Sequence, residues 1–148
     1  MKEIFDMRAM ELANRHLLRK RTHTRSFVVA PGAEVTWAFP RESFFRILEC
    51  GTLECPPGVT WRGFHCSSLL IFNALVYPVL DWFALTDTLP EDRTTPVFAL
   101  SAEPRVAIVL PRSTSIRELD TGKLQPTDRR FATGTVEGML MADWSEFS

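Results

Sequence analysis

Two hydrophobic patterns divide the chain. Between residues 2 and 21, apolar side chains recur on one helical face and charged side chains lie on the other, which predicts an amphipathic N-terminal helix. Later segments hold short runs rich in Val, Phe, Ile and Thr, bounded by Pro and Gly, and such runs are typical of β-strands. The first two, SFVVA and EVTWAF, are separated by Pro31-Gly32, so we expect adjacent strands joined by a turn.

The longest apolar run, LLIFNALVYPVLDWFAL, covers residues 69 to 85. Because it contains Asn73, Pro78 and Asp81 and falls short of the ~20 apolar residues of a membrane span, we interpret it as core. Its length favours a buried central helix that Pro78 would kink. A strand followed by a short helix is the alternative.

The remaining segments complete the expected architecture. Residues 41 to 50 predict a short helix, the polar residues 86 to 96 predict an exposed loop, and the last third predicts a meander of antiparallel strands with bulges or bends at Gly134 and Gly138. At 148 residues, one domain is expected. The prediction is an α+β fold over 1–148, in which an N-terminal helix (1–21) and a buried central helix pack on a mostly antiparallel sheet.

The charge distribution singles out the N-terminal segment. Residues 1 to 25 carry seven Lys and Arg against three Asp and Glu, whereas the rest carries ten against fifteen, for a net charge of -1. A concentration of cations at a helix end attracts acidic protein surfaces or nucleic acid, although it also complements the helix dipole without any ligand. The predicted partner-binding residues are Arg15, Arg19, Lys20, Arg21 and Arg25.

The cysteines suggest candidate chemistry near the middle of the chain. Cys50, Cys55, His65 and Cys66 have the spacing C-x4-C-x9-H-C, which lacks a tight C-x2-C knuckle, so no metal site is predicted. If residues 69 to 85 were helical, Cys66 and Asp81 would share one face with Asn73 and Tyr77, and His65 would adjoin it. The candidate catalytic residues are therefore Cys66, His65 and Asp81; the alternative is a buried polar ladder.

The sequence carries no P-loop, GxGxxG, HExxH or GxSxG pattern. The leading hypothesis is therefore a non-enzymatic inhibitor or adaptor, of a type common among accessory proteins of phages and mobile elements, that needs no cofactor and binds an acidic protein or nucleic acid through the basic helix end. A small hydrolase or transferase and an oligomeric structural protein are the alternatives. Free cysteines and a start without a signal-peptide pattern favour the cytoplasm, and no membrane contact is expected.

Overall fold

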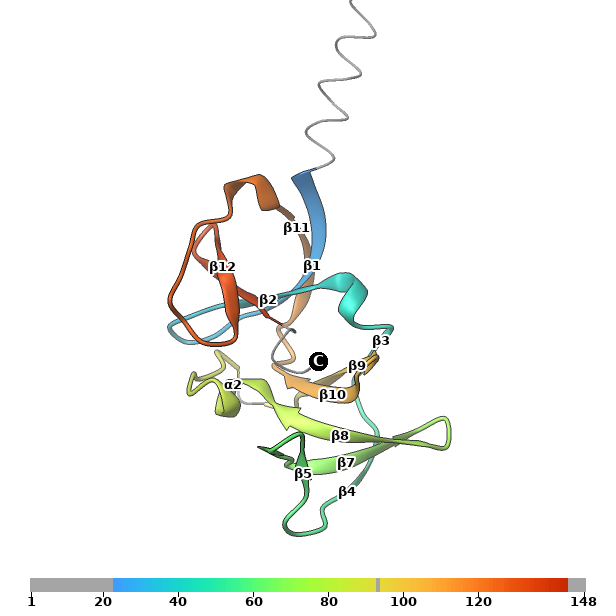
Figure 1. The fold of residues 1–148 in the computed structure, drawn as a ribbon. Helices are drawn as coiled ribbons and strands as arrows, with labels where there is room; N and C mark the ends of the chain where they lie inside the picture. Colours follow the sequence, from blue (N-terminus) through green and yellow to red (C-terminus); the bar gives the residue numbers. More distant parts are fainter. Residues whose placement is uncertain (1–22, 93, 144–148) are drawn as a thin grey trace, which may run out of the picture.

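The computed structural model describes residues 23–92 and 94–143, and this part of the chain is almost entirely β-structure. The predicted α+β class is therefore wrong. One five-stranded sheet occupies the upper half of Figure 1. Its strands, in spatial order, are β11 (Ser115–Asp120), β1 (Thr24–Ala30), β2 (Trp37–Pro40), β13 (Met139–Ala142) and β12 (Ala132–Val136). The predicted pairing of β1 with β2 is confirmed.

A six-stranded sheet forms the lower half of Figure 1. Its order is β3 (Arg46–Leu48), β9 (Val97–Ala102), β10 (Arg105–Leu110), β8 (Leu75–Asp81), β7 (Ser68–Phe72) and β4 (Thr52–Glu54). A small hairpin joins β5 (Thr60–Trp61) to β6 (Phe64–His65). Most pairs are antiparallel, but β10 runs parallel to β8 and β13 runs parallel to β2.

Each large sheet curls around its own apolar interior. In the upper sheet, a bridge between Gln125 and Thr135 brings the chain after β11 next to β12. In the lower sheet, the two edge strands β3 and β4 are consecutive in sequence and joined by three residues. The upper interior holds Phe27, Val29, Ala38, Leu119, Val136, Met139 and Met141; the lower holds Leu70, Tyr77, Val79, Phe98, Leu100 and Ala107.

A third and larger apolar cluster, the junction core, lies where the two barrel-like sheets meet. Its largest members are Trp37, Phe39, Trp82, Phe83 and Phe131. Successive residues of a strand alternate between a sheet's interior and the junction core, because side chains in a strand point to opposite faces in turn. Strands such as β9 and β10 are therefore buried on both faces.

The central segment corrects the predicted buried helix. Residues 69 to 85 form β7, a reversal at Asn73 and Ala74, β8, and a single turn of helix, α2 (Trp82–Leu85). Both turn residues have positive φ, 50° and 62°, which reverses the chain where a helix would have continued. A strand buried on both faces shows a continuous apolar run, and this run is indistinguishable from that of a buried helix.

Two further predictions differ from the structure. Residues 41 to 50 form a 3-10 turn, η1 (Arg41–Ser43), and then β3, because Phe44 is extended with φ -121° and ψ 135°. The predicted C-terminal meander is wrong after β10, since β11 crosses to the other sheet and pairs with β1. Residues after Asp120 form a second 3-10 turn, η2 (Thr121–Lys123).

The bulge expected near Gly134 is confirmed, since the register between β12 and β13 shifts between Ala132 and Gly134. Gly138, expected at a bulge or bend within one strand, has a φ of 79° in the turn that joins β12 to β13. Within the range 86 to 96, the described residues form no strand or helix, and Pro90 forms one isolated bridge; the exposed loop stays a prediction. Among the described residues, no helix has the length and apolar character that a membrane crossing requires. The predicted N-terminal helix (1–21) lies outside the described residues.

Candidate docking surfaces

The structure brings two of the predicted catalytic residues to one hollow and buries the third away from it. Cys66 is buried in the junction core, where its Sγ lies 3.9 Å from the carbonyl oxygen of Phe64. His65 is exposed on β6, and Asp81 is exposed at the end of β8. His65 and Asp81 line one hollow of about 480 Å³ together with Arg130 and Phe131, but Cys66 does not line it. The expected helical stripe does not form because its residues lie in strands and turns.

Burial also favours the protonated form of the Cys66 thiol. Loss of solvent raises the pKa of the Cys66 thiol above its ordinary value, because a buried thiolate is poorly solvated. The thiol is therefore protonated at neutral pH, whereas a nucleophilic cysteine needs a thiolate. This environment is that of a small apolar core residue.

We expect Cys66 to resist alkylation in the folded protein. Iodoacetamide at pH 7.5 should label Cys50 and Cys55, which are exposed, at least about tenfold faster than Cys66, since the thiolate is the reacting form. Labelling followed by peptide mass spectrometry measures all three rates in one sample, and unfolding in urea should abolish the difference. If Cys66 were labelled at the same rate as Cys50, the predicted protection would be wrong and the hydrolase or transferase alternative would be favoured.

In the described part of the chain, no three His, Cys, Asp or Glu side chains lie close enough together to hold a metal ion. Of the predicted basic residues, Arg15, Arg19, Lys20 and Arg21 lie outside the described residues. Arg25 is exposed near the start of β1.

Arg25 belongs to a surface of basic and apolar side chains that we call the junction patch. Its residues are Arg25, Arg41, Phe45, Arg46, Ile47 and Ile116, which come from β1, η1, β3, β11 and the residue before β3. They line two neighbouring hollows of about 260 and 550 Å³, which share Arg41 and Phe44. The patch therefore spans the boundary between the two sheets.

The apolar members of the junction patch are held in place by the strands beneath them. The backbone N–H of Phe45 donates to the carbonyl of Leu100 at 3.0 Å, and Ile116 is paired with Val28 across β11 and β1. The Phe45 ring lies 6.3 Å from the ring of Tyr77. Even so, Phe45 and Ile116 are each 52% exposed and Ile47 is 37% exposed. Three large apolar side chains are thus presented to solvent on a rigid support.

The charge of the junction patch is positive. Arg25, Arg41 and Arg46 face a single lining carboxylate, that of Glu42. The Arg46 guanidinium lies 5.4 Å from the centre of the Phe72 ring, a cation–π contact that keeps it over the apolar surface. Planar guanidinium groups beside apolar side chains suit a partner with carboxylates around an apolar anchor.

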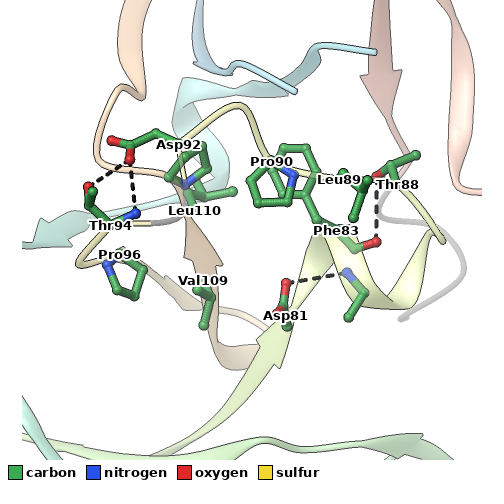
Figure 2. A pocket seen from close by; sticks show the side chains of 12 residues that line it. Asp81, Phe83, Thr88, Leu89, Pro90, Asp92, Thr94, Pro96, Val109 and Leu110 are labelled. Atoms are coloured by element: carbon green, nitrogen blue, oxygen red, sulfur yellow. Dashed lines mark hydrogen bonds between the residues drawn. The ribbon is translucent and has the colours of Figure 1, made fainter. Parts of the chain in front are cut away.

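A further hollow, the acidic groove, lies beside α2 and has a volume of about 390 Å³ (Figure 2). Its floor comes from Phe83 of α2 and Leu110 of β10, which are 2% and 1% exposed. Val109 is in register with Asp81, because β10 and β8 run parallel and end together. The groove is thus built where two parallel strands end and the chain turns into α2.

The outer wall of the acidic groove is tied to the turn between β1 and β2 and to β2. The N–H of Ala33 donates to the carbonyl of Leu89 at 2.9 Å, and the N–H of Glu91 donates to the carbonyl of Pro31 at 3.1 Å. The indole N–H of Trp37 donates to the Thr88 hydroxyl at 3.3 Å. These contacts fix residues 88 to 91 against the end of β1, so the groove is formed without a ligand.

Two carboxylates stand on the acidic groove. Asp81 accepts a hydrogen bond from the N–H of Ala84 at 3.3 Å and so caps α2. Asp92 accepts one hydrogen bond from the Thr94 hydroxyl at 2.7 Å and another from the Thr94 backbone N–H at 2.9 Å. These two bonds, with a smaller contribution from Arg112, hold the pKa of Asp92 below its ordinary value, so this carboxylate is ionised at neutral pH. Figure 2 shows Val109 and Leu110 between the two carboxylates.

Sequence reasoning missed nearly all of both surfaces. Phe45 and Ile47 lie in the segment 41 to 50, which predicted a short helix, and Ile116 lies in the last third, which predicted a meander of strands. Asp81 was a candidate catalytic residue, but the loop after α2 is what brings Asp92 to the same groove. The presence of prolines and aspartates in residues 86 to 96 indicated a loop and carried no sign of a groove.

Comparison with known proteins gives the fold alone. No protein-family model matches the chain, and no curated protein matches it. Among solved structures, it is similar to the scaffolding protein TtCheW from Thermoanaerobacter tengcongensis, with a TM-score of 0.64 and 10% sequence identity. The similarity covers 80% of this chain and 82% of that one. The expected link to phages or mobile elements receives no support from these comparisons.

Proposed function

We propose that this protein is a non-enzymatic adaptor that binds a protein partner through the junction patch. The observation that carries the proposal is the exposure of Phe45, Ile47 and Ile116 together among three arginines. Contiguous exposed apolar side chains on a folded domain mark interaction surfaces, and aromatic and Arg side chains are enriched at such interfaces. The scaffolding role named for the similar structure is consistent with an adaptor.

The chemistry of the patch favours an acidic protein over nucleic acid. Nucleic acid binding depends mainly on phosphate contacts by cations and gains from aromatic stacking platforms. Here aliphatic side chains, Ile47 and Ile116, make up much of the surface between the arginines. We therefore infer a partner segment that buries an apolar side chain at the centre and places Asp or Glu at the rim, where Arg25, Arg41 and Arg46 lie.

Parts of the sequence-based hypothesis remain predictions. Binding by Arg15, Arg19, Lys20 and Arg21 would extend the junction patch from Arg25 toward the N-terminus. The cytoplasmic location, the hydrolase or transferase alternative and the oligomeric structural alternative also remain predictions. The buried, protonated Cys66 gives the enzymatic alternative little support.

Truncating the patch is expected to weaken partner capture. The full chain carrying Phe45→Ala and Ile116→Ala should recover its partner from a lysate of the source cells about tenfold less well than the wild type, because apolar anchors dominate interface energies. Quantitative mass spectrometry of the captured proteins measures the loss. Capture should also weaken as salt is raised, because the arginine contacts are screened.

The matched control changes two equally exposed apolar side chains elsewhere. Leu53 and Leu124 are 43% and 48% exposed, and the Leu53→Ala, Leu124→Ala variant should capture the partner normally. Circular dichroism melting confirms that both variants fold. Equal capture by the two variants would refute the assignment to the junction patch, and capture that disappears on nuclease treatment would refute a protein partner.

A further inference from the structure

The acidic groove combines features that call for an occupant other than solvent. Its floor is apolar, its outer wall is fixed by hydrogen bonds to the end of β1, and Leu89 on its rim is 56% exposed. The volume of about 390 Å³ is at the small end of the roughly 300–1,000 Å³ range of ligand pockets. A protein segment lying across the groove would cover Leu89 on the rim together with the apolar floor.

Charge decides which kind of segment fits. Of the twelve described residues that line the groove, two are carboxylates and none is Lys or Arg, and the nearby Arg112 makes only a small contribution to the lowered pKa of Asp92. Asp81 and Asp92 repel phosphates, so they oppose the docking of nucleic acid or of an anionic membrane surface. They attract Lys and Arg, and Asp92 remains ionised through its two bonds from Thr94.

We propose that the acidic groove is a second docking site, which binds a segment of a partner protein that carries an apolar side chain flanked by Lys or Arg. The apolar side chain packs on Phe83 and Leu110, and the flanking cations pair with Asp81 and Asp92. The hydrogen-bonded wall makes the site preformed, which reduces the cost of ordering it on binding. The assignment depends on residues that are separate from the junction patch.

The position of the acidic groove gives it a further consequence. In Figure 1, α2 lies at the left end and β3 at the right end of the boundary between the two sheets. The junction patch prefers acidic partners and the groove prefers basic ones, so one chain can hold two chemically different partners at once. This bridging role rests on the proposed function, whereas the groove itself does not.

Selection from a peptide library tests the groove directly. A phage-displayed library of random 12-residue peptides is selected on the immobilised full chain, and enriched sequences are synthesised with a fluorescent label. We expect enrichment of Lys or Arg on both sides of an apolar residue. Fluorescence anisotropy should show about tenfold weaker binding to the Asp81→Asn, Asp92→Asn variant, because two ion pairs are lost, and similarly weaker binding to Leu89→Ala.

The substitutions are chosen to leave the fold intact. Asparagine is about as good a helix cap as aspartate, and its side-chain oxygen can accept the same hydrogen bonds. The double variant therefore loses charge and keeps its contacts. Glu54→Gln with Glu137→Gln changes the net charge equally at exposed sites outside the groove and should bind the peptide as the wild type does. The Phe45→Ala, Ile116→Ala variant should also bind it normally, so this result is independent of the first docking site.

Three results would overturn the proposal. One is the absence of enrichment, or enrichment of peptides without basic residues. Another is equal binding to the Asn variant and to the Gln control. The third concerns a synthetic peptide of residues 1–22. If this peptide displaces the selected peptide and binds the groove more tightly, the occupant would be the chain's own basic segment in place of a partner.

Discussion

Replacing Trp82 with alanine is expected to lower the free energy of unfolding by about 3–5 kcal/mol, the usual cost of deleting a fully buried large aromatic side chain. Trp82 is 0% exposed in the junction core. Its ring centre lies 5.0 Å from that of Phe39, 5.3 Å from that of Trp37 and 5.9 Å from that of Phe131. Because Trp82 lies in α2, directly after β8 of the lower sheet, and the other three rings belong to β2 and to the chain before β12, the cavity would loosen the contact between the two halves.

Urea denaturation followed by circular dichroism measures this loss. Domains of this size have about 5–15 kcal/mol of stability, so the variant should unfold at a much lower urea concentration. The half-exposed Leu53→Ala serves as a control and should cost under about 1 kcal/mol. A Trp82→Ala midpoint close to that of the control would mean that the two sheets do not share one core.

Gly32→Ala is expected to cost about 3 kcal/mol or more, at the upper end of overpacking effects. A Cβ on Gly32 would collide with the carbonyl oxygen of Val35 and would lie 3.0 Å from that of Leu89. Both are backbone atoms, so relief requires the turn between β1 and β2 to move. The Gly32–Pro90 bridge and the hydrogen bond from Ala33 to Leu89 would be lost with it.

Gly58→Ala provides the contrasting case. Gly58 has a φ of 73°, and nothing lies within 4 Å of an added Cβ, so its alanine variant pays the left-handed backbone cost of roughly 1 kcal/mol and no collision. Urea midpoints of the two variants give the comparison, and peptide binding reports on the groove wall. If Gly32→Ala were no less stable than Gly58→Ala, the close approach of the turn to residues 88–90 would be wrong.

The candidate sites show where sequence reasoning reached its limit. Exposed Phe45 and buried Phe44 are adjacent and chemically identical, and only their opposite directions on an extended chain distinguish them. Asp81 and Asp92 are brought to one groove by the loop after α2, which is anchored to the turn at Pro31. Nothing local in the sequence encodes that anchoring, because its hydrogen bonds use backbone groups that every residue has.

The sequence by itself determined the positions of many strands and turns. The Pro31-Gly32 turn, the bulge near Gly134 and the bend at Gly138 follow from local backbone preferences. The helical interpretation of residues 69 to 85 was wrong because a strand buried on both faces loses the alternation of apolar and polar residues that identifies strands. Only the tertiary structure decided that β11 leaves β10 to pair with β1, that a core forms between two curled sheets, and that two surfaces of opposite charge lie beside it. Those choices depend on contacts between residues far apart in the chain, whereas local preferences act over a few residues.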